Sequence, residues 1–149
     1  MKLKSLLSSL PINIDLGILI LRVTVGLTMM FYGYQKLTHY TEMVEDDFWK
    51  NHVSLFGMKG SIPLLLTIFA EFFCSIFLLL GLYTRLALFF LLFCMGYIAF
   101  YLDAFELIRA GDNGLEMNSA FNYFLMYLAL LFTGAGKYSL DAILLSRKK

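Results

Sequence analysis

The feature that most constrains this chain is the apolar stretch from Ser61 to Arg85, which carries an acidic residue, Glu71, near its middle. A run of this length and hydrophobicity is long enough to cross a bilayer as a helix. A carboxylate at the centre of such a helix costs roughly 2.5–3.5 kcal/mol on insertion scales unless it has a partner or a proton. The sequence therefore predicts a membrane span that must accommodate a charge inside the protein.

Composition extends this interpretation to the whole chain. Of the 149 residues, 60% are hydrophobic and 15% are charged, whereas about 25% of the residues of a soluble domain are charged. The mean hydropathy is +0.74. We therefore expect residues 1–149 to form a single integral membrane domain with the lipid bilayer as its partner. The net charge of +1 argues against nucleic acid as a partner.

Four apolar segments predict four membrane spans, at about residues 15–37, 62–83, 86–107 and 116–133. Only helices or closed barrels satisfy the backbone in lipid, and long continuous apolar runs exclude the alternating barrel pattern. The predicted fold class is all-α, an antiparallel four-helix bundle in the membrane.

Local signals place the ends and connections of these spans. Asn13 or Asp15 can cap the first span, and glycines at 134 and 136 end the last one. We expect tight turns at Thr84–Arg85 and at residues 110–114, and a short interfacial helix within residues 38–60. Ser139 can cap a short amphipathic tail. Residues 1–11 are expected to lie uncleaved at the membrane surface.

The distribution of Lys and Arg predicts the orientation. One side of the predicted bundle holds seven such residues and the other side holds four. Because cytoplasmic loops carry the excess of positive charge, both termini should be cytoplasmic. The first group is Lys2, Lys4, Arg85, Lys137, Arg147, Lys148 and Lys149, and the second is Lys36, Lys50, Lys59 and Arg109.

Arg22 is a basic residue deep in the first span, and it shares one helical face with Gly26, Met29 and Gly33. Small residues on that face allow a neighbouring helix to approach closely, so Arg22 should point into the bundle. Its depth differs from that of Glu71 by roughly one to two helical turns. We expect the two charges to neutralise one another. The pair could fix helix register or line a ligand site, or Glu71 could handle protons alone.

A second polar group is expected at the outer mouth of the bundle. The end of the first span supplies Tyr32, Gln35, Lys36 and His39, and the fourth span supplies Asn118 and Asn122, one turn apart. This group is either a solvated rim or a vestibule leading to the buried charges. The third and fourth spans add Asp103, Glu106 and Glu116 to it.

Metal and cysteine chemistry have weaker support. His39 and His52 lie in the same loop region as Asp46 and Asp47, but their spacing matches no metal template, so no metal site is predicted. Cys74 and Cys94 lie inside apolar runs without a C-x-x-C motif. They are expected to be buried small hydrophobes, although similar depths would allow a redox pair.

Three motifs together resemble the DoxX family of small membrane proteins. The first is Arg22 with Gly26, Gly33 and Lys36, and the second is Glu71 followed by Gly81 and Arg85. The third is the closing run TGAGKYSLD. The resemblance covers about residues 16–141. Two positions depart from the family pattern: Tyr32 stands where a histidine is frequent, and Ala135 stands where a proline is usual.

This resemblance implies a small, multi-pass, four-helix protein of the bacterial inner membrane. Relatives in the family include the small subunit of thiosulfate:quinone oxidoreductase, and others are associated with quinone or oxidative-stress responses. The resemblance therefore suggests a quinone as ligand and a redox enzyme subunit as partner, with homo-oligomers left open. The alternatives are a small proton-coupled transporter, or a non-catalytic membrane assembly or scaffold protein.

Overall fold

The computed structural model describes residues 12–103, 108–111 and 114–146, and within them the chain is mostly helical. Three candidate membrane-spanning helices cover Ile14–Thr38, Ser61–Leu80 and Thr84–Leu102. The prediction of an all-helical membrane protein is confirmed to this extent. The expected surface segment, residues 1–11, lies outside the described residues.

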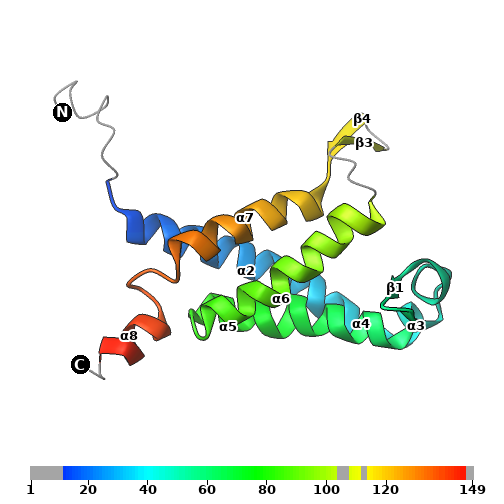
Figure 1. Cartoon of the computed structure of the whole chain (residues 1–149), viewed down its shortest axis with the longest axis horizontal. Helices are drawn as coiled ribbons and strands as arrows, with labels where there is room; N and C mark the ends of the chain where they lie inside the picture. Colours follow the sequence, from blue (N-terminus) through cyan, green and yellow to red (C-terminus); the bar gives the residue numbers. More distant parts are fainter. Residues whose placement is uncertain (1–11, 104–107, 112–113, 147–149) are drawn as a thin grey trace.

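The helices follow one another along the chain and are joined by short loops and two small hairpins (Figure 1). In chain order they are α2 (Ile14–Thr38), α3 (Tyr40–Glu45), η1 (Phe48–His52), α4 (Ser61–Ile68), η2 (Phe69–Cys74), α5 (Ser75–Leu80), α6 (Thr84–Tyr97), η3 (Ile98–Leu102), α7 (Ser119–Thr133) and α8 (Leu140–Ser146). The three η segments are π-helical. The hairpins pair β1 (Ser54–Leu55) with β2 (Met58–Lys59) and β3 (Ile108–Gly111) with β4 (Gly114–Met117).

Helix α2 begins where the sequence predicts. The Asn13 side chain accepts a hydrogen bond from the Leu16 amide and so caps the first turn. The face predicted to point inward is buried along its whole length, from Arg22 through Gly26 and Met29 to Gly33.

The second span is one continuous helix in three parts, α4, η2 and α5. Gly81 ends it in the left-handed conformation at φ 65°, which glycine adopts without steric cost. The predicted turn at Thr84–Arg85 is therefore displaced: the turn occupies residues 81–83, and Thr84 already begins α6.

The fourth apolar segment differs from its prediction. Glu116 and Met117 belong to the hairpin strand β4, and Asn118 caps α7 by accepting from the Phe121 amide. Helix α7 has 15 residues, which is about 22 Å of helix and shorter than the roughly 30 Å hydrocarbon core. The expected turn at 110–114 forms part of the β3–β4 hairpin, although residues 112–113 are outside the described residues.

The connection that follows α2 and the one that joins α7 to α8 can be compared with their predictions. The segment expected to form one interfacial helix contains two short helices, α3 and η1, followed by the β1–β2 hairpin. Gly134 ends α7 at φ 79°, and Ser139 caps α8 by accepting from the Ala142 amide. The predicted end of this helix at a glycine and the predicted Ser139 cap are both confirmed.

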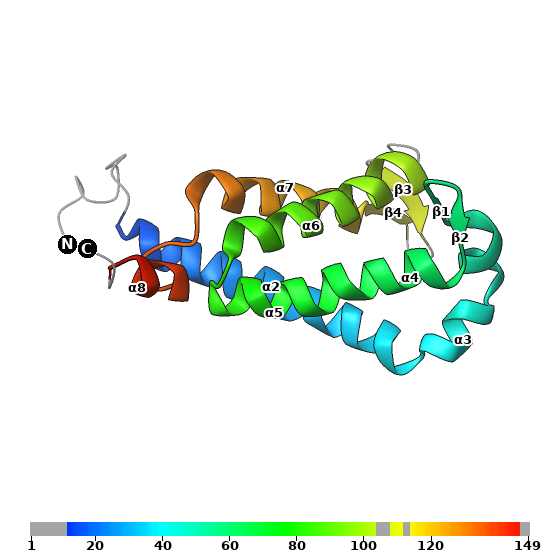
Figure 2. The same ribbon diagram turned by 60° about the horizontal axis from the view of Figure 1, so that its bottom comes forward.

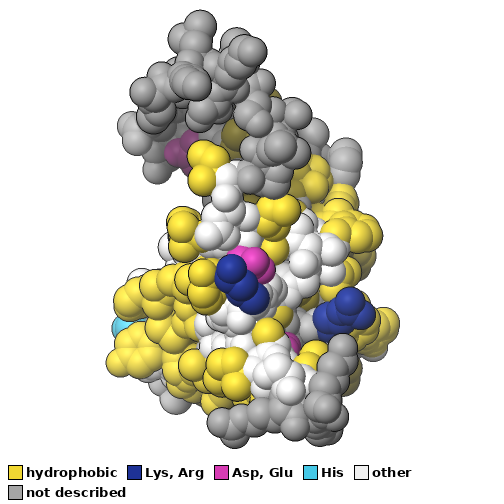
Figure 3. Space-filling view, turned by 90° about the vertical axis from the view of Figure 1, so that its left-hand side faces the viewer, with side chains coloured by type: hydrophobic (Ala, Val, Ile, Leu, Met, Phe, Trp, Pro, Cys, Tyr) yellow, Lys and Arg dark blue, Asp and Glu magenta, His cyan; other side chains and the backbone are white. Residues whose placement is uncertain are grey.

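Figures 1 and 2 show the long helices packed lengthwise, with α2 beside α5 and α6 beside α7. Helix α8, the start of α2 and the α5–α6 turn lie at one end, and both hairpins lie at the other. The main core contains mostly aliphatic side chains such as Val25, Leu78, Leu88 and Leu130. Figure 3 views the molecule from the end that bears α8, where hydrophobic side chains lie among a few basic and acidic ones.

Candidate functional site

Arg22 is 1% exposed and binds the loop between α7 and α8. Its guanidinium donates hydrogen bonds to the backbone carbonyls of Ala135 and Tyr138, the latter at 2.7 Å. Both acceptors belong to residues 134–139, which we call the C-terminal loop. Charge-assisted bonds of this kind are stronger than bonds between neutral groups. Arg22 therefore holds the C-terminal loop against the first half of α2.

Gly81 makes room for the arginine. A Cβ atom at this position would lie 2.5 Å from an Arg22 nitrogen and 2.5 Å from the Ser139 Cβ. Any side chain here would therefore displace the guanidinium or the C-terminal loop. The arrangement brings together residues from α2, from the α5–α6 turn and from the entry to α8.

Asp141 completes this end of the molecule. Its two carboxylate oxygens accept from the Tyr83 and Thr84 amides, each at 2.9 Å, and so cap the start of α6. Burial tends to raise the pKa of the Asp141 carboxyl, but these hydrogen bonds and the Arg22 charge outweigh it and lower the pKa below its ordinary value. The carboxylate is therefore an anionic cap in the folded protein.

Glu71 is also buried, as the sequence predicts, but its partner is Lys36 rather than Arg22. The Lys36 ammonium donates to a Glu71 carboxylate oxygen, with side chains that are 20% and 3% exposed respectively. The expected Arg22–Glu71 pair is therefore replaced by two separate sites. We call this second one the Lys36–Glu71 site.

Helix geometry explains why the expected pair does not form. Gly33 packs directly on η2, where an added Cβ would lie 2.5 Å from the Phe72 nitrogen and 2.7 Å from the Glu71 carbonyl carbon. Glu71 is thus level with Gly33, which is 11 residues beyond Arg22 on α2. That is about 16 Å of helix, well beyond the reach of an arginine side chain. The expected offset of one to two turns was too small.

The surroundings of the Lys36–Glu71 site are polar on several helices. Ser75, one turn beyond Glu71, is fully buried, as is Tyr127 on α7. Cys94 and Cys74 are both free and buried, as expected for small hydrophobes.

A cavity of about 540 Å³ opens beside this site, and its walls are almost wholly apolar. Lys36 lines it, together with Thr67 and Cys94. The rest of the lining comes from α4, η2, α6, η3 and the segment that follows α3, and much of it is aromatic. We call this space the aromatic cavity. Its remaining lining residues are Phe48, Trp49, Val53, Leu55, Phe56, Pro63, Leu66, Phe69, Ala70, Phe89, Phe90, Phe93, Tyr97, Ile98 and Leu102.

Several cavity-lining side chains on η2 and α6 are exposed hydrophobics. Phe69, Phe89 and Phe93 line the cavity and are 40%, 63% and 47% exposed. Both helices belong to candidate membrane spans, where exposed apolar side chains suit contact with lipid.

The residues predicted to form the outer mouth differ in their exposure to solvent. On α2, Tyr32 and Gln35 are exposed, as is His39 just after its end, and His39 contacts the Gln35 carbonyl one turn before it. Lys36, from the same predicted group, is the residue that turns inward. Its role in a vestibule stays a prediction.

The fourth-span members of the predicted mouth lie at the start of α7. Asn118 is buried and donates to the Asp103 carboxylate at 2.9 Å, whereas Asn122 is partly buried and Glu116 is exposed. Glu106 is outside the described residues. The Asp103–Asn118 bond joins the end of η3 to α7.

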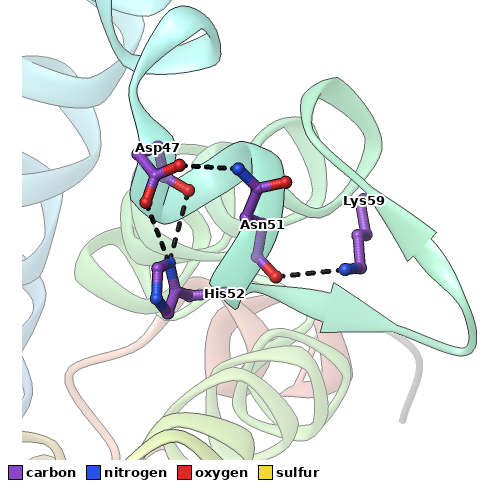
Figure 4. Close-up of polar contacts among 4 residues, drawn as sticks. All are labelled: Asp47, Asn51, His52 and Lys59. Carbon is purple, nitrogen blue, oxygen red and sulfur yellow. Dashed lines mark hydrogen bonds and ion pairs between the residues drawn. The ribbon is translucent and has the colours of Figure 1, made fainter.

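The acidic loop that precedes the second span forms its own polar network (Figure 4). The Asp47 carboxylate accepts from the Asn51 side chain at 2.6 Å and lies 3.5 Å from His52. Lys59, on β2, donates to the Asn51 carbonyl. Among the described residues, no cluster of three or more His, Cys, Asp or Glu side chains could hold a metal ion. These contacts stabilise the turn between η1 and the β1–β2 hairpin.

Sequence reasoning missed the partner of Glu71, although one signal was available. Lys36 follows Arg22 by 14 residues, which is close to four full helical turns and therefore the same face of α2. It also follows Gly33, the close-contact glycine, by three residues. Placing Lys36 at the rim ignored this periodicity.

Comparison with known proteins supports the motif resemblance. The family model described as DoxX matches residues 17–104, which is 88 of the 149 residues. Searches of curated proteins and of solved structures return no match. The matched region includes Arg22, Gly33, Lys36, Glu71 and Gly81, the residues that build the two polar sites. Since the match covers more than half of the chain, this protein belongs to the DoxX family.

Proposed function

We propose that this protein binds a small, flat, hydrophobic molecule of the quinone class in the aromatic cavity and serves a redox system of the membrane. The observation that carries this proposal is the combination of largely aromatic walls with one ammonium group, that of Lys36, among the described lining residues. Pockets for small molecules are mostly apolar and have a few placed polar groups that fix orientation. The Lys36 ammonium can donate to a quinone carbonyl while the ring and tail contact aromatic side chains.

The proposal includes the arrangement in the membrane. All four apolar helices cross the bilayer as an antiparallel bundle in the bacterial inner membrane, with both termini cytoplasmic. The grouping of α8 with the α5–α6 turn at one end supports this, because Arg85 and Lys137 then lie on the cytoplasmic side. The proposed partner is a subunit of a redox enzyme. This part of the proposal is based on the family resemblance.

The sole tryptophan of the chain, Trp49, lines the aromatic cavity and provides the test. A short-chain quinone added to the protein in lipid nanodiscs should quench its fluorescence in a saturable manner. Phe93→Ala, which removes a lining ring, should weaken binding roughly ten-fold, equivalent to about 1.4 kcal/mol. Phe132→Ala on α7 is the matched control, because Phe132 is outside the cavity lining and 82% exposed. Equal quenching in both variants would remove the cavity as the binding site.

A second candidate is a small proton-coupled transporter. The observation that favours it is a buried carboxylate within a π-helical segment, since such segments are frequent at functional sites and intramembrane carboxylates serve as proton relays. Uptake by proteoliposomes that depends on a pH gradient and on Glu71 would favour transport. Saturable quinone binding without such uptake would favour the first proposal.

A further inference from the structure

Lys36 is the one charged side chain among the described residues that line the aromatic cavity, and Glu71 binds it from outside that lining. We propose that Glu71 makes the cavity selective for uncharged ligands: neutral amphiphiles with a hydrogen-bond acceptor bind, and anionic amphiphiles such as fatty acids are rejected. This inference rests on the proposed function and specifies the ligand class of the same cavity.

The first step of the argument is the charge balance of the site. A lone ammonium in an apolar cavity would attract a carboxylate strongly, because attraction between opposite charges grows as the local dielectric constant falls. With Glu71 already in contact with Lys36, the pair is neutral as a unit. A carboxylate ligand would then place a second negative charge beside Glu71 in an environment that solvates it poorly.

The second step is that Glu71 has little freedom to leave. Its side chain is 3% exposed, and its backbone is in contact with Gly33 of α2, where even a Cβ atom would overlap with it. An anionic ligand would have to separate Glu71 from Lys36, and a side chain this deeply buried has little solvent to stabilise the displaced carboxylate. The contact between α2 and η2 therefore maintains the selectivity.

The third step concerns neutral ligands. An ammonium has three N–H donors, and the bond to Glu71 uses one of them. Lys36 can therefore donate to a carbonyl or ester oxygen without giving up its carboxylate partner. Neutral acceptors bind to the intact pair, whereas anions must compete with it.

The test compares two ligands of matched shape, a bromine-labelled dodecanoic acid and its methyl ester, by quenching of Trp49 in nanodiscs. In the wild-type protein we expect the ester to bind at least ten-fold more tightly than the acid. Glu71→Gln leaves the Lys36 charge uncompensated, so affinity for the acid should rise at least ten-fold while that for the ester changes less than three-fold. Glu116→Gln, which removes the same charge at an exposed position, should change neither affinity.

The double variant Lys36→Gln/Glu71→Gln separates charge from packing. It removes both charges, so the gain in acid affinity should disappear even though Glu71 is absent. An unchanged acid-to-ester ratio in Glu71→Gln, with ester binding intact, would overturn the inference and leave the cavity proposal standing. Failure of both ligands and of the short-chain quinone to quench the wild-type protein would overturn both. If Glu71→Gln does not fold, the wild-type protein still decides: binding of the acid as tightly as the ester, or more tightly, overturns the inference.

Discussion

At the scale of single residues, two cations on α2 bind separate partners: Arg22 is buried, and Lys36 is partly buried. Arg22 holds the C-terminal loop through two backbone carbonyls, and Lys36 holds the Glu71 carboxylate. A planar guanidinium suits two separated acceptors, whereas an ammonium is a compact point charge that suits one carboxylate. The choice of side chain at each position thus matches what it binds.

This division predicts which charges are energetically coupled. Lys36→Met leaves Glu71 buried without a partner and should cost about 3–5 kcal/mol in the free energy of unfolding. Adding Glu71→Gln should recover part of that loss, giving a coupling energy of about 1–3 kcal/mol. Unfolding in mixed detergent micelles, followed by circular dichroism, would measure all four members of the cycle.

The control for this cycle combines Glu71→Gln with Arg22→Met. Arg22 and Glu71 share no hydrogen-bond or ion-pair partner among the described residues and are separated by about three helical turns. The two effects should therefore add to within about 0.5 kcal/mol. A large coupling here, or none between Lys36 and Glu71, would contradict the division into two sites.

The sequence is sufficient to predict that Arg22 and Glu71 are buried, because an apolar span can tolerate a charge only inside the protein. It is not sufficient to assign their partners. That assignment depends on how far α2 is shifted along η2, and the shift is set by the contact of Gly33 with the η2 backbone. The acceptors of Arg22 are backbone carbonyls, which leave no residue-type signature in the sequence.

At the scale of elements, the contact between α2 and η2 at Gly33 brings two helix backbones together. A methyl group at this position would meet backbone atoms at 2.5 and 2.7 Å, so the helices would have to separate. Backbone cannot move aside as a flexible side chain can. Lys36 lies about one turn from Gly33 on α2, and the Glu71 backbone is itself part of the contact, so the Lys36–Glu71 site depends on it.

Gly33→Ala should therefore destabilise the protein by more than about 1 kcal/mol and weaken quinone binding in the cavity. Gly17→Ala is the matched control on the same helix, because a Cβ atom added there would meet nothing within 4 Å. At that position alanine should be neutral or stabilising by up to about 1 kcal/mol. Thermal unfolding of both variants checks the contrast, and equal effects would contradict the close-contact role.

Asp141 joins α8 to α6, and its contribution should depend on pH. Its folded-state pKa is lowered, with burial opposed by the Thr84 and Tyr83 hydrogen bonds and by the Arg22 charge. The stabilisation is therefore complete above the unfolded-state pKa of about 3.9 and is lost as the pH falls through the folded-state value. Asp141→Asn should be less stable than the wild type at pH 7.

The measurement for this prediction is the free energy of unfolding between pH 7 and pH 3. The wild-type and Asp141→Asn curves should converge toward acid, because protonation removes from the wild type what the variant already lacks. A constant difference between the curves across this range would show that the Asp141 charge does not act as the cap of α6.

The sequence predicts the ends of helices well where residues close by in the chain determine them. The Asn13 and Ser139 caps and the glycine at the end of α7 each act within a few residues. The fourth span was less accurate because it was begun at Glu116, whereas Glu116 and Met117 belong to β4 and Asn118 caps α7. The π-helical segments depend on tertiary packing and have no periodic signal in a single chain.

At the scale of the whole molecule, the architecture depends on whether α7 crosses the membrane. It is an apolar helix of 15 residues that packs along α6, and a helix shorter than the hydrocarbon core can be accommodated by local thinning of the bilayer. If α7 crosses, three crossings separate α3 from α8. If it does not, two crossings separate them.

Cysteine accessibility distinguishes these cases, because an odd number of crossings places the two ends on opposite sides of the membrane. The background variant replaces Cys74 and Cys94, both buried, with alanine, and it should not react with a membrane-impermeant maleimide. Thr41→Cys on α3 should then be labelled in intact cells, whereas Ser146→Cys on α8 should be labelled only after lysis. Labelling of both from the outside would leave α7 on one side of the bilayer. The reversed pattern would keep the four crossings but place the excess of Lys and Arg outside, against the charge distribution on which the orientation rests.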